Sequence, residues 1–93
     1  VVQEFITKYK AAYGGPPDAF AVLAYDAANV AFAAMDRAKE LTGPSIRDEI
    51  EKTKDFKGVT GSITIDAKHD SIKSAVIIGI EKNQSKYAAT VQP

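Results

Sequence analysis

The chain has 93 residues, of which 45% are apolar and 26% are charged, a composition typical of a folded domain and not of a disordered segment. Twelve basic residues balance twelve acidic ones, so the net charge is zero and no basic stripe indicates nucleic-acid binding. Without cysteine, the chain has neither a disulfide framework nor a thiolate metal site. This length suggests one domain or part of one.

Two helices are predicted in the first half of the chain. Apolar residues recur at helical spacing over residues 2–13, and Gly14-Gly15-Pro16-Pro17 ends this helix, since proline cannot continue it. Asp18 is a suitable N-cap for a second helix over residues 18–39.

The second helix is unusually apolar. Between residues 19 and 35 its only polar side chains are Tyr25, Asp26 and Asn29. A helix that is apolar on nearly all sides is either buried on nearly all sides or spans a membrane. This run is shorter than the roughly 20 residues that a span needs, and Asp26 interrupts it, so we expect burial within the protein.

A third helix is predicted over residues 46–53, after a break at Thr42-Gly43-Pro44. Ser45 and Asp48 have the spacing of a capping box at its start, although Asp is a weaker partner than Glu.

After the third helix the spacing of the apolar residues changes from a period of 3.6 to a period of 2, which indicates that strands follow. Alternation predicts a strand over residues 59–66, and two further strands are predicted over residues 73–82 and 86–91, with a turn at Asn83-Gln84-Ser85 between them. The run from Ala75 to Ile80 is almost continuously apolar, which predicts a strand covered on both faces. The expected class is therefore α/β, with three helices followed by three strands.

No arrangement of residues predicts catalysis. The single histidine, His69, lies in a polar turn with Asp66 and Asp70, and the usual zinc sites need further ligands. Gly58-Val59-Thr60-Gly61 lacks the lysine and the strand-loop-helix context of a phosphate loop. We expect no enzyme activity, no metal and no cofactor.

Two residues of the second helix are candidates for binding. Asp26 is a carboxylate in an apolar helix, and burial would require a partner: a ligand ammonium, a backbone N–H or a lysine from a neighbouring element. Pairing within the protein is the more common case. Phe20 lies in the first turn beside a loop, where side chains line either a cleft or the core.

Five motifs occur in a fixed order along the chain. They are Phe5-x-x-x-Tyr9-x-x-x-Tyr13-Gly14, Pro17-Asp18-Ala19-Phe20-Ala21, Ala24-Tyr25-Asp26-Ala27, Ile46-Arg47-Asp48 and Phe56-x-Gly58-Val59-Thr60-Gly61-x-Ile63-x-x-Asp66. Each motif is weak alone, but the ordered series resembles the C-terminal part of the branched-chain amino-acid-binding proteins of ABC transporters. These are type I periplasmic binding proteins, also called extracellular ligand-binding receptors.

The resemblance implies a two-lobed fold of which this chain is the C-terminal segment, about the last quarter. In this family three chain crossovers join the lobes, the ligand binds between them, and the final segment contributes to both lobes. Members bind leucine, isoleucine or valine, and relatives bind amides, urea or aromatic acids. The implied partners are a small ligand and a membrane permease. The implied location is periplasmic or extracellular, with a lipid anchor if the source is Gram-positive.

One site residue follows from the resemblance. Phe20 matches a position whose ring contacts the ligand side chain at the cleft, and Tyr25 and Asp26 are second candidates near the hinge. The groups that bind the ligand's carboxylate and ammonium are expected outside these residues. The chain departs from the family at His69 and in the final turn, where glycine is usual.

Two alternatives remain open from the sequence. A domain of the same fold could sense a ligand for a signalling protein, and a small α/β enzyme would require a nucleophile–base pair or a metal set that is not found. If nothing covers the apolar second helix, the chain is expected to associate with itself as a dimer.

Overall fold

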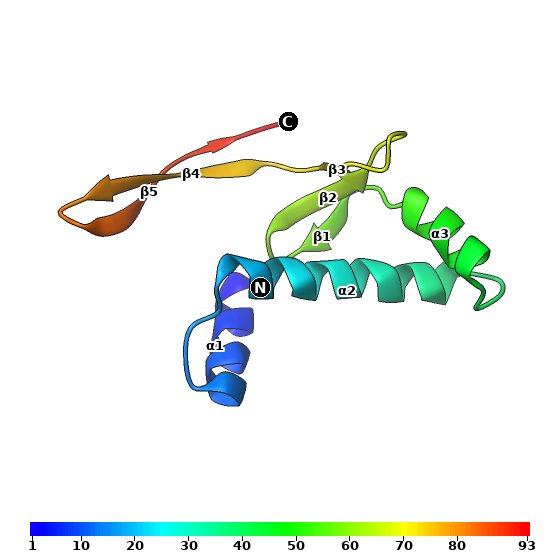
Figure 1. Ribbon diagram of the computed structural model, residues 1–93, viewed down its shortest axis with the longest axis horizontal. Helices are drawn as coiled ribbons and strands as arrows, with labels where there is room; N and C mark the ends of the chain where they lie inside the picture. Colours follow the sequence, from blue (N-terminus) through cyan, green and yellow to red (C-terminus); the bar gives the residue numbers. More distant parts are fainter.

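The computed structural model describes all of residues 1–93 (Figure 1). Three helices precede five strands: α1 (Val2–Tyr13), α2 (Ala19–Arg37), α3 (Gly43–Glu51), β1 (Phe56–Gly58), β2 (Gly61–Ile65), β3 (Ser71–Ile72), β4 (Ala75–Glu81) and β5 (Gln84–Val91). The strands form two antiparallel sheets, one in the order β1-β2-β3 and one of β4 with β5. The α/β class with helices before strands is confirmed.

Local signals fix both ends of the first connection. Gly14 takes the left-handed conformation, with φ 78°, and its N–H donates to the carbonyl of Lys10 at 2.8 Å. This is the helix end that glycine favours, because it has no Cβ. At the start of α2, the Asp18 carboxylate accepts from the N–H of Ala21 at 2.8 Å, as its N-cap position predicts.

The start of α3 differs from the expectation. Thr42 is the N-cap and its hydroxyl accepts from the N–H of Ser45 at 3.4 Å, so the helix begins at Gly43 and not at residue 46. The prediction of a capping box at Ser45 and Asp48 is wrong. Pro44 lies in the first helical turn, where its missing N–H costs nothing, so Thr42-Gly43-Pro44 begins the helix instead of only breaking the chain.

The predicted strand over residues 59–66 begins two residues too early: β2 covers Gly61–Ile65, and a further strand, β1 (Phe56–Gly58), precedes the predicted range. Gly58 pairs with Gly61, and Val59 and Thr60 form the two-residue turn between β1 and β2. Valine and threonine have high β-propensity, so the alternating pattern continued through the turn without marking it. Gly61 has φ 115°, a conformation that side chains rarely adopt.

The last hairpin turns one residue earlier than predicted. Its turn is Lys82-Asn83, both with positive φ (49° and 62°), and Gln84 already pairs with Glu81. Two left-handed residues match the twist of a two-residue hairpin, and asparagine tolerates this conformation best after glycine. His69, at the other departure from the family, also has positive φ, 67°.

Little of the chain is buried. The residues with buried side chains are Asp26, Val30, Ala34, Thr53 and Ile63. The radius of gyration is 15.7 Å, against about 12 Å for a compact domain of this length. Figure 1 shows the reason: α3 and the small sheet cover one side of α2, while the β4–β5 ribbon extends away from the helices.

Two elements that were expected to be buried are largely exposed in this chain by itself. α2 is not buried on nearly all sides, since Phe20 and Phe32 are exposed, and β4 is not covered on both faces, since Ile77 and Ile80 are exposed. The apolar sequence of both elements suits a buried environment, but no element of these 93 residues packs on those faces.

α2 is also the one helix whose length and composition would suit a membrane span. That is weak evidence, because the core helix of a soluble protein meets the same criteria. Asp26 in its middle and its packing against α3 and β1 are typical of a core helix.

Candidate functional site

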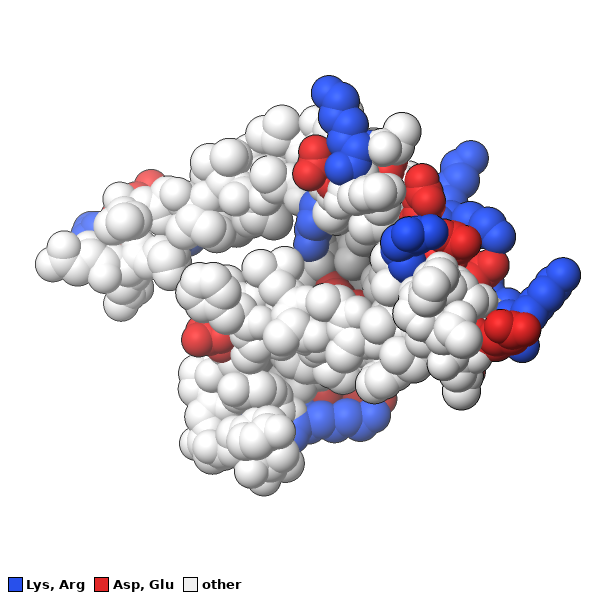
Figure 2. Space-filling model, turned by 45° about the vertical axis from the view of Figure 1, so that its right-hand side comes forward, with Lys and Arg blue, Asp and Glu red and all other residues white.

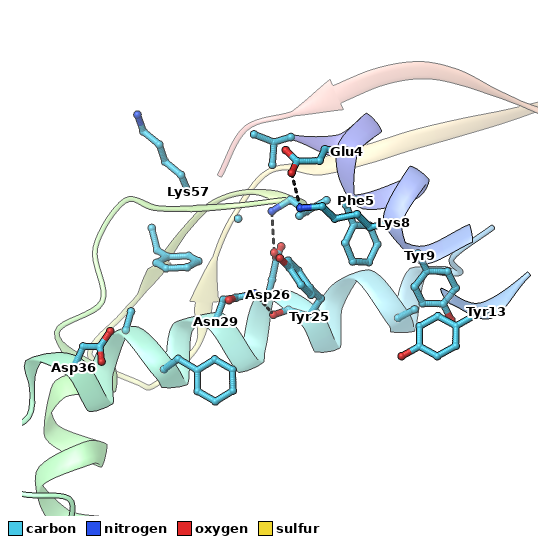
Figure 3. A pocket seen from close by; sticks show the side chains of 17 residues that line it. Glu4, Phe5, Lys8, Tyr9, Tyr13, Tyr25, Asp26, Asn29, Asp36 and Lys57 are labelled. Atoms are coloured by element: carbon cyan, nitrogen blue, oxygen red, sulfur yellow. Dashed lines mark hydrogen bonds and ion pairs between the residues drawn. The ribbon is translucent and has the colours of Figure 1, made fainter. Parts of the chain in front are cut away.

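Asp26 joins α2 to the turn between β1 and β2. Its side chain is buried, with 2% of its surface exposed. One carboxylate oxygen, Oδ1, accepts from the N–H of Val59 at 2.8 Å, and Oδ2 accepts from the N–H of Thr60 at 2.8 Å and from its hydroxyl at 2.6 Å. The carboxylate therefore satisfies the donors of the turn and fixes the hairpin against the helix (Figure 3).

The surroundings of Asp26 keep it ionised. Burial alone would raise the pKa of this carboxyl group, but the hydroxyl and N–H of Thr60, the N–H of Val59 and the ammonium of Lys73 together lower the pKa below its ordinary value. Of the partners that the sequence left open, the structure shows backbone N–H groups. Lys73 contacts Asp26 only indirectly: its Nζ donates to the hydroxyl of Thr60, which in turn donates to Asp26.

Glycine is required at position 58 by this arrangement. A Cβ built on Gly58 would lie 2.6 Å from Oδ2 of Asp26 and 2.8 Å from its Cγ. Such distances lie well inside van der Waals contact, so any side chain would displace the carboxylate from the turn. Gly58 thus allows a close approach between the hairpin and α2.

A groove lies beside Asp26, between α1, α2 and β1, with a volume of about 840 Å³ (Figure 3). Aromatic rings form much of its wall: Phe5, Tyr9, Tyr13, Tyr25, Phe32 and Phe56. The ring centroids of Phe5 and Tyr25 are 4.8 Å apart, at a tilt of 51° that is usual for aromatic pairs. This pair connects α1 to α2.

The three predicted site residues are not brought together in one pocket. Tyr25 and Asp26 line the groove, but the ring of Tyr25 packs on Phe5, and the oxygens of Asp26 are occupied by the turn. Phe20 lies outside the groove in the first turn of α2, with 80% of its surface exposed. Unlike the ring of Tyr25, the ring of Phe20 makes no aromatic contact within the chain.

Sequence reasoning did not identify Thr60 and Lys73 as partners of Asp26. The available signals were a buried carboxylate that required donors and a Gly58-Val59-Thr60-Gly61 segment that could form a tight turn. The sequence does not show that the two meet, because they lie 33 positions apart.

A family model described as "Periplasmic binding protein" matches residues 1–84. The chain belongs to the periplasmic binding protein family. This confirms the resemblance and the type of fold that it implied. Proteins of this family are substrate-binding proteins of the periplasm or cell exterior, and the family is not catalytic.

Solved structures of family members match almost the whole chain. The leucine binding protein LivK of Thermotoga maritima is 36% identical, with a TM-score of 0.85 over 100% of this chain and 27% of its own. The branched-chain amino acid transporter substrate binding protein LivJ of Streptococcus pneumoniae, in complex with isoleucine, is also 36% identical, with a TM-score of 0.85 over 99% of this chain and 26% of its own. An ABC transporter substrate-binding protein of Desulfitobacterium hafniense, in complex with Leu, is 25% identical, with a TM-score of 0.83 over 94% of this chain and 26% of its own.

The chain thus spans about a quarter of the length of these proteins. A comparison with curated proteins gave no significant match.

Replacing Asp26 by asparagine tests the anchor. The pKa of Asp26 is lower in the folded state than in the unfolded state, so the unfolded state binds more protons in acid. The stability that the ionised Asp26 contributes is therefore lost as the pH falls from 3.8 through the folded-state pKa. Above pH 3.8, Asp26→Asn should lower the free energy of unfolding by about 1.5–3 kcal/mol, because the substitution removes hydrogen bonds to a charged acceptor. Urea denaturation followed by circular dichroism at several pH values measures both effects.

Asp36→Asn is a matched control on the same helix, since Asp36 has no ion pair or side-chain hydrogen bond. An equal loss in both variants at neutral pH, or an unchanged acid dependence in Asp26→Asn, would contradict the anchoring role.

Proposed function

We propose that this chain acts as the C-terminal part of an extracellular solute-binding protein that captures an amino acid, most readily a branched-chain one, for an ABC transporter. One observation carries the proposal: the chain matches a leucine binding protein and an isoleucine complex over essentially all of its length, at 36% identity. The expected partner is the transporter's permease, and a lipid anchor is expected if the source is Gram-positive.

The exposed ring of Phe20 is the proposed ligand contact. It lies at the start of α2, 80% exposed, and makes no aromatic contact within the chain. A ring held on a rigid helix offers an apolar surface to a leucine or isoleucine side chain. Tyr25 and Asp26 support it from one to two turns further along α2, where Tyr25 packs on Phe5 and Asp26 holds the hairpin.

The ligand's ammonium and carboxylate would be bound outside this chain. Within the proposed contact region, the carboxylate of Asp26 already accepts three hydrogen bonds from Val59 and Thr60. The chain is therefore proposed to recognise the ligand's side chain, while closure of two lobes provides the polar contacts.

A chimaera tests this function. The matching C-terminal segment of the Thermotoga maritima leucine binding protein is replaced by this chain, and titration calorimetry measures the affinity for leucine, isoleucine and valine. The chimaera should unfold cooperatively and bind at least one of them. A cooperatively folded chimaera that binds none of the three would contradict the proposal.

Within this chimaera, Phe20→Ala should weaken binding by about tenfold to a hundredfold, because burying a phenylalanine side chain contributes about 1.5–3 kcal/mol. Leu41→Ala is the control, since Leu41 is 76% exposed in the connection at the opposite end of α2. Equal affinities of the Phe20→Ala and unsubstituted chimaeras would show that the ring does not touch the ligand.

We also propose that the 93-residue chain associates with itself when nothing else covers its apolar faces. In Figure 2 most charged side chains gather around α3 and its neighbouring loops, where ion pairs such as Lys52–Glu49 (2.8 Å) form. The ribbon carries charged side chains only near its tip, at Glu81, Lys82 and Lys86. Exposed apolar faces of this extent favour association. Analytical ultracentrifugation should show a dimer or larger species, and Ile78→Lys in the exposed β4 should shift it toward monomer. A monomer at every concentration would contradict this proposal.

A further inference from the structure

The chain leaves the small sheet at one short segment. β3 has only two residues, Ser71 and Ile72, paired with β2, and the ribbon of β4 and β5 begins at Ala75. Between them, Lys73 and Ser74 are half-buried, whereas the strand residues on either side, Ile72 and Ala75, are exposed. Beyond this segment the ribbon makes no substantial packing contact with the helices or the small sheet, as Figure 1 shows.

Lys73 connects this crossover segment to α2. Its Nζ donates to the hydroxyl of Thr60, and the same hydroxyl donates to Oδ2 of Asp26 at 2.6 Å. No other side-chain hydrogen bond or ion pair links residues 73–93 to the rest of the chain, since Tyr87–Thr90 and Glu81–Lys86 lie within the ribbon.

The segment also approaches the hairpin closely beside Lys73. A Cβ built on Gly61 would lie 3.6 Å from the hydroxyl oxygen of Ser74, so the backbone of Gly61 and the crossover are in near contact. Lys73 reaches from this segment into the space between α2, α3 and β2, where it lies with Asp26 and Ala27 in the wall of a second cavity. The pairing of Ser71 and Ile72 with β2 and the hydrogen bond of Lys73 thus attach the β4–β5 ribbon to the rest of the chain.

We propose that Lys73 is a positioning residue: through Thr60 and Asp26 it fixes the direction in which the β4–β5 ribbon leaves α2. A two-residue strand alone allows the following segment to swing, because few dihedral angles are restrained at its end. The charge-assisted hydrogen bond at Lys73 adds a second fixed point, one residue beyond the strand.

The consequence for binding rests on the proposed function. If α2 carries Phe20 in one lobe and the ribbon continues into the other, the angle between them sets the width of the gap that the ligand fills. Loss of the Lys73 contact would then raise the cost of reaching the closed state and weaken the apparent affinity.

The absence of cysteine allows a direct measurement of this angle on the 93-residue chain. Spin labels on Ala28→Cys in α2 and Ser85→Cys in β5, both exposed positions, report the distance between helix and ribbon by double electron–electron resonance. The labelled chain is diluted with excess unlabelled chain, so that only distances within one molecule are measured. Lys73→Met is compared with Lys73→Arg, which keeps a charged donor at this position.

We expect one narrow distance distribution for the unsubstituted chain, a broader or displaced one for Lys73→Met, and recovery of most of the original distribution in Lys73→Arg. Unchanged distributions in a folded Lys73→Met would overturn the proposal. So would loss of folding in Lys73→Met, because Lys73 would then be a general determinant of stability and not of direction.

The chimaera gives the second arm of the test. There, Lys73→Met should weaken leucine binding about tenfold, as expected for loss of a hydrogen bond to a charged group, and Lys73→Arg should restore most of the affinity. Failure of the unsubstituted chimaera to bind any amino acid would contradict the proposed function only, since the distance measurement needs no ligand. Full affinity in a Lys73→Met chimaera would contradict the effect of Lys73 on binding.

Discussion

The burial of one carboxylate determines how the helices and the first sheet of this chain fit together. Asp26 is ionised and almost inaccessible to solvent, and it accepts three hydrogen bonds from Val59 and Thr60. A buried charge is tolerated only when its partners are in place, so the turn between β1 and β2 must lie against α2 at this point. The apolar contact of α2 within the chain is small, since Val30 and Ala34 are its only other buried residues, and the polar contact therefore sets the register.

The same contact connects the features that matter for binding. Phe20 precedes Asp26 by six residues on one uninterrupted helix, so their Cα atoms lie about 9 Å apart along the helix axis. Lys73 lies on the other side of the anchor, where the chain leaves the small sheet. The proposed ligand contact and the segment that would lead into a second lobe are thus both oriented by one network of hydrogen bonds.

Local signals in the sequence were sufficient for the first two helices and for the fold class. The helix end at Gly14 and the N-cap at Asp18 depend on residues within one turn, and both lie where capping chemistry predicts. The turn at Val59 and Thr60 was missed because its stabilising partner, Asp26, is 33 positions away, and the hydrogen bond from Lys73 to Thr60 spans 13. The apolar patterns of α2 and β4 predict covering layers, which these 93 residues do not supply, so both elements are largely exposed here. Phe20 was a candidate from its position beside a loop, but only the family resemblance favoured the cleft, since a phenylalanine at such a position is as typical of a core.

A crystal structure of the chimaera with leucine bound would test this account most directly. We predict that the ring of Phe20 lies against the ligand's side chain, with Asp26 still within hydrogen-bonding distance of the N–H groups of Val59 and Thr60. A ligand bound away from Phe20, or an Asp26 carboxylate turned from the hairpin to bind the ligand's ammonium, would contradict it.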